Sequence, residues 1–374
     1  MEYITVNGKK LRTGYTTGSC ATAAAKAAAQ MLFLDKKITS VCLVTPSGAN
    51  LTIEILDVIK DENGVSCAVK KDSGDDPDIT NGMLVYVKVS KISQKTVNIK
   101  GGKGVGIVTK AGLDQPVGNH AINSVPRKTI TEELTQVASD YGYDFGFDVE
   151  ISLPQGEELA KKTYNSRLGI IGGLSIIGTS GIVEPMSEDA IIDTIYAQIN
   201  VQYESGQKVL LLTPGNYGKD FIAQSNLISS EVAIKCSNYI GKAIDYAYSK
   251  GFTQILIIGH GGKLLKLACG LFNTHSKYGD CRAEVLATYA ALNGANSDVI
   301  EKLISSVTVD EMLCVLDKEN ITEKVLQAVL MRVDFHINAR VYGQIDIATV
   351  IFTDKRGVIG KTNKAEMLLN RLGE

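Results

Sequence analysis

The 374-residue sequence lacks several features that would assign a protein class at once. It contains no tryptophan, and its formal net charge is only −2, so no strong positive field favours nucleic acid and an anionic ligand must be held by local donors. No run approaches the roughly 18 to 20 apolar residues that span a membrane, and the N-terminus lacks the apolar stretch of a secretory signal. These absences predict a soluble, cytoplasmic protein that binds neither nucleic acid nor membrane.

Cysteine is present but follows no recognisable spacing. The seven cysteines are scattered along the chain without a CxxC pair or the ligand spacing of a zinc site. This distribution is typical of reduced thiols in a cytosolic compartment, so neither disulfides nor a protein-bound metal is expected. The chain also exceeds the size at which a single core usually stops growing, which predicts two domains.

The pattern of strands and helices changes near residue 160. Before that point short β-rich runs predominate and only two helices stand out, at the alanine-rich segment and at 131–142. Residues 1–160 are therefore predicted to form an α+β domain with an open, largely antiparallel sheet. The β-rich runs are 40–48, 51–59, 64–71, 83–90 and 147–154.

After a polar stretch at 155–167, apolar strands alternate with helices. Residues 161–374 are therefore predicted to form an α/β domain with a mainly parallel sheet. Its strands are expected at 208–213, 253–259 and 344–352, and its helices at about 229–250, from about 263, and at the C-terminus.

A hydroxyl-rich glycine turn runs directly into a helix made mostly of alanine between Gly14 and Ala28. Ser19 is expected to cap this helix, Thr16 and Thr17 add hydroxyl groups, and the first helical turn offers free backbone N–H groups at the positive end of its dipole. The pattern indicates either an anion site that a flat ligand can approach closely or a capped, tightly packed core helix.

Three connections rich in glycine or hydroxyl groups follow predicted strands of the second domain. Ligands of open α/β sheets usually lie beyond the carboxyl ends of the strands, which makes these connections candidate cofactor contacts, although each alone also fits a tight turn. The residues concerned are Gly172, Gly173, Gly178, Thr179 and Ser180 in the first, Gly215 and Asn216 in the second, and Gly259, His260 and Gly261 in the third.

The segment 71–82 concentrates acidic residues, with Asp72, Asp75, Asp76 and Asp78 close together. Such a loop can hold a hard cation, present a general base or form a solvated turn, and the calcium-loop spacing fails because a proline interrupts it. Asp75 and Asp76 are the candidate catalytic residues of this loop. His275 is a third candidate, because histidine can accept a proton near neutral pH.

Several segments, in the same order, resemble the cobalt-precorrin-5B (carbon-1) methyltransferases of anaerobic cobalamin biosynthesis. The segments that carry the resemblance are Arg12–Cys20, 71–82, 102–113, 178–190, 213–218 and 259–277. The resemblance implies that S-adenosylmethionine methylates carbon 1 of cobalt-precorrin-5B to give cobalt-precorrin-6A, the cobalt belonging to the substrate. A small-metabolite kinase and a non-catalytic tetrapyrrole carrier are the alternatives, although the chain has no Walker A sequence.

The substrate that the resemblance implies is a flat macrocycle fringed with acetate and propionate groups, which needs apolar walls and several separate anion sites. We expect the first domain to bind it and the second to bind the methyl donor. Positioning should dominate catalysis, because the donor already carries a good leaving group. The candidate substrate-binding residues are Thr16, Thr17, Ser19, Lys103 and Arg127. A homodimer is expected, since closed dimers are the commonest oligomers.

Overall fold

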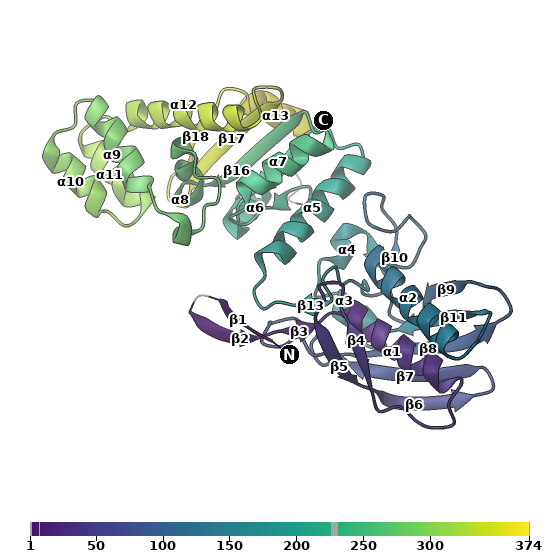
Figure 1. The fold of residues 1–374 in the computed structure, drawn as a ribbon. Coiled ribbons are helices and arrows are strands. Elements are labelled where there is room, and N and C mark those ends of the chain that lie inside the picture. The colour runs from purple at the N-terminus through teal and green to yellow at the C-terminus, as the bar shows by residue number, and fades with distance from the viewer. Residues whose placement is uncertain (1, 7, 226–230, 374) are drawn as a thin grey trace. The chain divides into compact units, whose positions relative to one another are not determined.

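The chain folds into two compact units, Met1–Glu188 and Asp189–Glu374, each containing a five-stranded sheet (Figure 1). The computed structural model describes residues 2–6, 8–225 and 231–373. Within these ranges no helix combines the length and apolar character needed to cross a bilayer.

The first unit is a mixed sheet with two long helices on one face. Its elements are β1 (Tyr3–Val6), β2 (Lys9–Arg12), β3 (Gly14–Tyr15), α1 (Thr17–Met31), β4 (Ser40–Val44), β5 (Asn50–Glu54), β6 (Leu56–Asp61), β7 (Gly64–Lys70), β8 (Leu84–Ile92), β9 (Val97–Gly101), β10 (Ile107–Val108), α2 (Ser124–Asp140), β11 (Gly146–Ser152), α3 (Gly156–Ala160), α4 (Asn165–Leu168), β12 (Ile170–Ile171) and β13 (Ile182–Val183). The sheet has the order β6-β7-β8-β11-β9, antiparallel except for the parallel pair β11 and β9.

The alanine helix α1 forms the centre of the first core. All its residues except Lys26 and Gln30 are buried, and it packs on β7 and β8 beside α2, which lies over β9 and β11. Alanine is suited to this place because its small side chain lets the helix approach the sheet, α2 and β4 closely. The structure therefore favours the packed core helix over an alanine face open to a flat ligand.

The sequence placed the domain boundary near residue 160, whereas the compact first unit continues to Glu188. The reason is pairing over long distances in sequence: β12 pairs with β10, and β13 pairs with β3. The connection containing Gly172 to Ser180 consequently belongs to the first unit and does not follow a strand of the parallel sheet.

The second unit is an α/β layer structure with a mostly parallel sheet. Its elements are α5 (Glu188–Glu204), β14 (Leu210–Thr213), α6 (Asn216–Ser225), β15 (Ile234–Lys235), α7 (Ile240–Lys250), β16 (Gln254–His260), α8 (Gly261–Leu264), the 3₁₀ turns η1 (Leu265–Cys269) and η2 (Ser276–Tyr278), α9 (Arg282–Leu292), α10 (Ser297–Ser305), α11 (Val309–Lys318), α12 (Thr322–Arg340), β17 (Asp346–Thr353), β18 (Gly357–Lys361) and α13 (Ala365–Leu372). The sheet order is β15-β14-β16-β17-β18, and only β18 is antiparallel to its neighbour.

Helices cover both faces of this sheet, which explains why β14, β16 and β17 are nearly continuous apolar runs. One core holds side chains of α5, α7, η1, α9 and α12, and the other holds those of α6 and α13. After β14 the chain moves outward to β15, whereas after β16 it moves the opposite way to β17. The strand order therefore reverses between β14 and β16, where open α/β sheets usually bind ligands.

The three apolar strands predicted for this unit are present as β14, β16 and β17. The helix expected at about 229–250 begins only at Ile240, and its first part falls partly on residues 226–230, which lie outside the described residues. The helix expected from about 263 is the short α8, which passes at once into η1.

Candidate functional site

The segment Arg12–Cys20, called the N-terminal motif below, and the acidic loop 71–82 form one hydrogen-bonded junction in the first unit. Arg12 binds Asp72 through two N–H···O bonds of 2.6 and 2.8 Å, and the Asp72 carbonyl accepts from the Tyr15 amide at 2.8 Å. A Cβ at Gly14 would lie 2.3 Å from the Ser73 carbonyl carbon, so the two backbones touch. The two motifs are therefore parts of one structure.

The two candidate bases of the acidic loop hold neighbouring backbone. A side-chain oxygen of Asp75 accepts from the Arg12 amide at 2.6 Å, and one of Asp76 accepts from the Met186 amide at 2.9 Å. These bonds give both carboxylates a structural role in the junction. A role in proton transfer stays a prediction.

The acidic loop also contains a buried lysine, Lys71. Lys71 is 3% exposed and contacts both the Asp78 carboxylate and the Ser73 hydroxyl, the latter at 2.6 Å. Burial opposes ionisation of Asp78, but the charge of Lys71 and hydrogen bonds from Lys71 and Thr80 outweigh it and hold the pKa of Asp78 below its ordinary range. The Arg12 guanidinium likewise lowers the pKa of Asp72.

These lowered pKa values predict how acid affects the first unit. A carboxyl whose pKa is lower in the folded state stabilises the protein above its unfolded pKa of about 4, and that contribution is lost as the pH falls through the folded value. We expect the thermal midpoint to change little between about pH 7 and 5 and to drop below about pH 4. Asp72→Asn should be less stable than wild type at pH 7 and nearly equal to it in acid, as followed by circular dichroism. Asp144→Asn changes an exposed carboxylate and is the control. The difference between its thermal midpoint and that of wild type should stay the same at every pH.

The start of α1 is bound internally to the segment 177–181. The helix begins at Thr17, and its cap is Thr16, whose hydroxyl accepts from the Ser19 amide at 3.2 Å, so the prediction of Ser19 as the cap was wrong. The Gly18 amide donates to the Ile177 carbonyl at 2.9 Å, and the Ser19 hydroxyl donates to the Gly181 carbonyl at 2.7 Å. Two of the amides expected to face an anion thus have partners within the protein.

The exposed groups near this helix start come from the neighbouring loop. Thr179 and Ser180 are exposed, Thr16 is half-buried, and Thr17 and Ser19 are buried. A Cβ at Gly178 would lie 2.3 Å from the Thr16 hydroxyl, so this glycine allows the loop to contact the cap.

The segment 170–181 connects this junction with the glycine loop 101–106. The Leu174 amide donates to the Gly104 carbonyl at 2.9 Å, and a Cβ at Gly173 would lie 2.0 Å from the same oxygen, while Gly172 faces open space. Lys103 is exposed on this loop. The structure thus brings the glycines predicted for the cofactor beside residues predicted for the substrate.

Arg127 is engaged in the backbone of the first unit. Its guanidinium donates to the Ile122 carbonyl at 2.8 Å and to the Ile99 carbonyl at 3.0 Å, and burial lowers its pKa. These contacts tie α2 to the end of β9.

The second candidate region is the carboxyl edge of the parallel sheet in the second unit, formed by residues 213–218 at the end of β14, 235–238 at the end of β15 and 259–263 at the end of β16. The first and third of these loops touch: a Cβ at Gly259 would lie 2.7 Å from Pro214. Thr213 is fully buried, and its hydroxyl has no hydrogen-bond partner among the described residues. Two of the three predicted connections therefore meet at the reversal of strand order.

His260 links this edge to α8. Its Nδ1 accepts from the Gly262 amide at 3.0 Å, so the neutral ring carries its proton on Nε2, which lies 3.9 Å from an Asp354 carboxylate oxygen. The ring also stands near Tyr217 and Phe352, with centroid separations of 5.9 and 5.7 Å. Gly261 is buried beside it, at the first position of α8.

Two lysines on this edge were not among the predicted site residues. Lys235 donates to the Asn216 side chain at 2.6 Å, and the Lys263 ammonium lies 3.5 Å from the Ser237 carbonyl. Lys263 belongs to the glycine motif that drew attention to His260, but its direction depends on the turn into α8. Lys235 is the last residue of β15, whose two residues are too few for a recognisable pattern.

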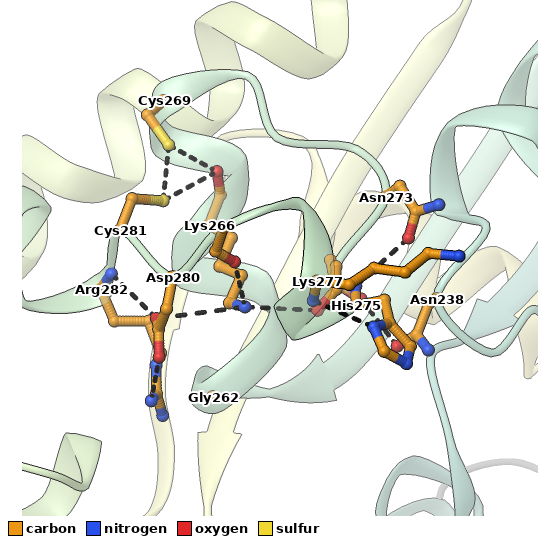
Figure 2. Close-up of polar contacts among 12 residues, drawn as sticks. Asn238, Gly262, Lys266, Cys269, Asn273, His275, Lys277, Asp280, Cys281 and Arg282 are labelled. Atoms are coloured by element: carbon orange, nitrogen blue, oxygen red, sulfur yellow. Dashed lines mark hydrogen bonds and ion pairs between the residues drawn. The ribbon is translucent and has the colours of Figure 1, made fainter. Parts of the chain in front are cut away.

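His275 lies on an exposed loop that is anchored to the segment after β15 (Figure 2). The neighbouring Thr274 amide donates to the Asn238 carbonyl at 3.0 Å, and His275 Nδ1 accepts from the Lys277 amide at 3.1 Å. The buried Lys266 holds the loop through the carbonyls of Thr274 and Gly279, at 3.3 and 2.9 Å. His275 thus belongs to the second unit, and Asp75 and Asp76 belong to the first.

Two thiols lie behind this loop. The sulfur atoms of Cys269 and Cys281 are 2.7 Å apart, and both contact the Lys266 carbonyl (Figure 2). Burial and the hydrogen bond with Cys269 raise the pKa of Cys281 to about 12, which keeps this thiol protonated at neutral pH. Within residues 2–6, 8–225 and 231–373 no cluster of three or more His, Cys, Asp or Glu side chains is suited to a metal ion.

Taken together, the two units define a protein of mixed α/β class, whose second unit has an open, mostly parallel sheet with a reversal of strand order. The chain belongs to the CbiD family: the family profile CbiD matches residues 4–185, and the profile of the CbiD C-terminal domain matches residues 273–363. The first of these matches ends close to the boundary between the two units.

Two relatives that match nearly the whole length of this chain have the same name. A protein of Ruminiclostridium cellulolyticum (strain ATCC 35319 / DSM 5812 / JCM 6584 / H10), named cobalt-precorrin-5B C(1)-methyltransferase, is 49% identical over 94% of this chain and 92% of its own. One of Thermoanaerobacter sp. (strain X514) with the same name is 42% identical over 97% and 99%. A crystal structure of the cobalamin biosynthesis protein CbiD from Archaeoglobus fulgidus matches with 29% identity over 75% of this chain and 87% of that chain, at a TM-score of 0.41.

Proposed function

We propose that this chain transfers a methyl group from S-adenosylmethionine to carbon 1 of cobalt-precorrin-5B, giving cobalt-precorrin-6A. The observation that carries the proposal is the 49% identity, over nearly all of both chains, to a protein named for this reaction. The sulfonium donor supplies an activated methyl group, so the protein has to hold it in line with the ring carbon and exclude water.

We assign the donor to the carboxyl edge of the second unit. The edge lies where the strand order reverses, and Gly215 and Gly259 keep side chains away from the loops beside it. The buried Thr213 hydroxyl, without a partner among the described residues, is a polar group that a ligand or a water could satisfy there. Asn216, His260 and Gly261 complete the proposed donor contacts.

We assign the macrocycle to the first unit, along the segment that joins the glycine loop to the start of α1. Lys103, Thr179 and Ser180 are exposed there and can meet the acetate and propionate groups. Gly172, Gly173 and Gly178 lie on the same segment. We therefore propose that these glycines, with Thr179 and Ser180, contact the macrocycle and not the methyl donor. Thr16 is half-buried at the same place, whereas Thr17, Ser19 and Arg127 support it from within.

Calorimetric titration with S-adenosylhomocysteine, the product of the donor, tests the proposal without the unstable substrate. We expect saturable binding with a dissociation constant in roughly the micromolar to millimolar range, and no binding of ATP with magnesium. Binding of ATP in place of S-adenosylhomocysteine would contradict the methyltransferase and support a kinase. Conversion of cobalt-precorrin-5B to a product heavier by one methyl group, followed by mass spectrometry, then separates an enzyme from a carrier.

A further inference from the structure

The ammonium group of Lys263 lies where three loops of the carboxyl edge meet. Its Nζ is 3.5 Å from the Ser237 carbonyl, in the segment after β15, and 3.6 Å from the position that a Cβ of Gly215 would occupy, in the loop after β14. The lysine itself belongs to α8, directly after β16. The charge thus stands at the point where the strand order reverses.

This charge lacks a counter-charge in the described parts of the chain. Lys263 is half-buried, and its single hydrogen bond, to Ser237, is long. The charged or titratable groups that act on Lys263 are Cys236 and two further cations, Lys235 and Lys266. Burial raises the pKa of the Cys236 thiol to about 12, so this thiol stays protonated and supplies no negative charge. Burial lowers the pKa of Lys263, because the ammonium loses water without gaining a carboxylate.

The buried Lys266 shows the contrast, since it makes hydrogen bonds to two carbonyls and lies 4.0 Å from Asp280. Lysines withdrawn from water are normally paired in this way. An ammonium with two unused donors fits a place kept for an anionic ligand.

The loop opposite Lys263 leaves room for such a ligand. Gly215 has a φ of +117°, a conformation that favours glycine, and the absence of a Cβ there leaves the space toward the ammonium open. Lys235 adds a second positive charge on the same edge and is tied to Asn216. Two cations and an open glycine turn are suited to a carboxylate group.

We propose that Lys263 binds the α-carboxylate of the methyl donor and so fixes the amino-acid end of that molecule at the carboxyl edge. The proposal rests on the proposed function, since it assumes that the donor occupies this edge. S-adenosylmethionine offers a carboxylate and ATP offers phosphates, so the two lysines would attract either ligand. Discrimination between the two ligands would then come from the other residues of the carboxyl edge.

The test compares two ligands that differ in the carboxylate. S-adenosylhomocysteine carries the amino-acid group, and 5′-methylthioadenosine lacks it. In Lys263→Met, calorimetry should show S-adenosylhomocysteine affinity reduced by about 10- to 100-fold and methylthioadenosine affinity changed by less than about twofold. Lys263→Arg should restore part of the loss, and Lys242→Met, which removes an exposed lysine of α7, should bind both ligands as wild type does.

A purely structural lysine would give different results. Without ligand, Lys263→Met should unfold at the same temperature as wild type or higher, because it removes a half-buried charge that no carboxylate compensates. Equal losses for both ligands, no loss for S-adenosylhomocysteine, or a lower melting temperature would each overturn the anchor. If wild type binds methylthioadenosine and S-adenosylhomocysteine equally, the anchor fails while the donor site stands. If it binds neither, the proposed function fails as well.

Discussion

Gly14→Ala should lower the free energy of unfolding of the first unit by more than about 3 kcal/mol, one of the largest effects expected from a single methyl group in this chain. The added Cβ would lie 2.3 Å from the carbonyl carbon of Ser73, 2.4 Å from the carbonyl oxygen of Asp72 and 2.5 Å from the amide of Gly74. All three are backbone atoms, so no side chain can turn aside. The strand and the acidic loop would have to separate, which would break the hydrogen bond of 2.8 Å between Tyr15 and Asp72.

Gly118→Ala is the matched control for this prediction. Gly118 also belongs to the first unit, but a Cβ there would meet nothing within 4 Å, and its cost comes only from the φ of +89°. That strain should amount to about 1–2 kcal/mol. Urea denaturation followed by circular dichroism measures both variants. Equal stability of the two would show that the contact between the N-terminal motif and the acidic loop is looser than the structure has it.

Much of the sheet structure could be predicted from the sequence because it depends on local patterns. Strands β4, β7, β8 and β11 read as short β-rich runs between turn residues, and β14, β16 and β17 read as apolar runs. They supply β7, β8 and β11 of the first five-stranded sheet and β14, β16 and β17 of the second, whereas β4 pairs with β5 in a separate two-stranded sheet. In these two sheets, β9, β15 and β18 were not predicted, and the single run predicted at 51–59 is divided between β5 and β6. Strand β15 has only two residues, which is too short for a recognisable pattern.

The boundary between the units could not be predicted for a different reason. Strands β12 and β13 have two residues each, and each pairs with a partner more than sixty residues earlier. Composition near residue 160 changes before the first unit is complete, because the chain returns to β10 and β3 after that change. Periodicity contains no information about such distant pairing.

The candidate residues were chosen from their types, and the number of free donors among them was overestimated. Ser19 and Arg127 look like ligands in the sequence, yet their donors bind the carbonyls of Gly181, Ile122 and Ile99. A buried polar group must find a partner, and in these cases the partner is backbone from distant segments. In the structure, the exposed neighbours Thr179 and Ser180 and the uncompensated charge of Lys263 are better candidates for binding a ligand.

The acidic loop illustrates the same point with charge. From the sequence, its aspartates could hold a cation, act as bases or face solvent; in the structure Asp72 and Asp78 neutralise Arg12 and Lys71. The charges of Asp72 and Asp78 thus fix the loop to Arg12 and Lys71, while a role of Asp75 and Asp76 in proton transfer stays a prediction. Substitutions of Asp72 or Asp78 should therefore lower stability first and lower activity as a consequence.

Lys71→Met should destabilise the first unit by about 3 kcal/mol, because removing one partner of a buried ion pair leaves the other uncompensated. The side chain of Lys71 is 2% exposed and that of Asp78 is 25% exposed, so the carboxylate would keep its bonds from Thr80 but lose its nearest positive charge. Lys70→Met, which removes the exposed neighbouring lysine, should cost less than about 0.5 kcal/mol.

A double variant distinguishes lost charge from lost packing. If the penalty comes from the stranded carboxylate, Lys71→Met with Asp78→Asn should be at least about 1 kcal/mol more stable than the sum of the two single changes predicts. Additive effects would mean that Lys71 contributes by filling space. If Lys71→Met were as stable as Lys70→Met, the ion pair of Lys71 with Asp78 would not stabilise the first unit. In the first case the stability of Lys71→Met should also recover relative to wild type in acid, since protonation of Asp78 then removes the uncompensated charge and, in wild type, abolishes the ion pair.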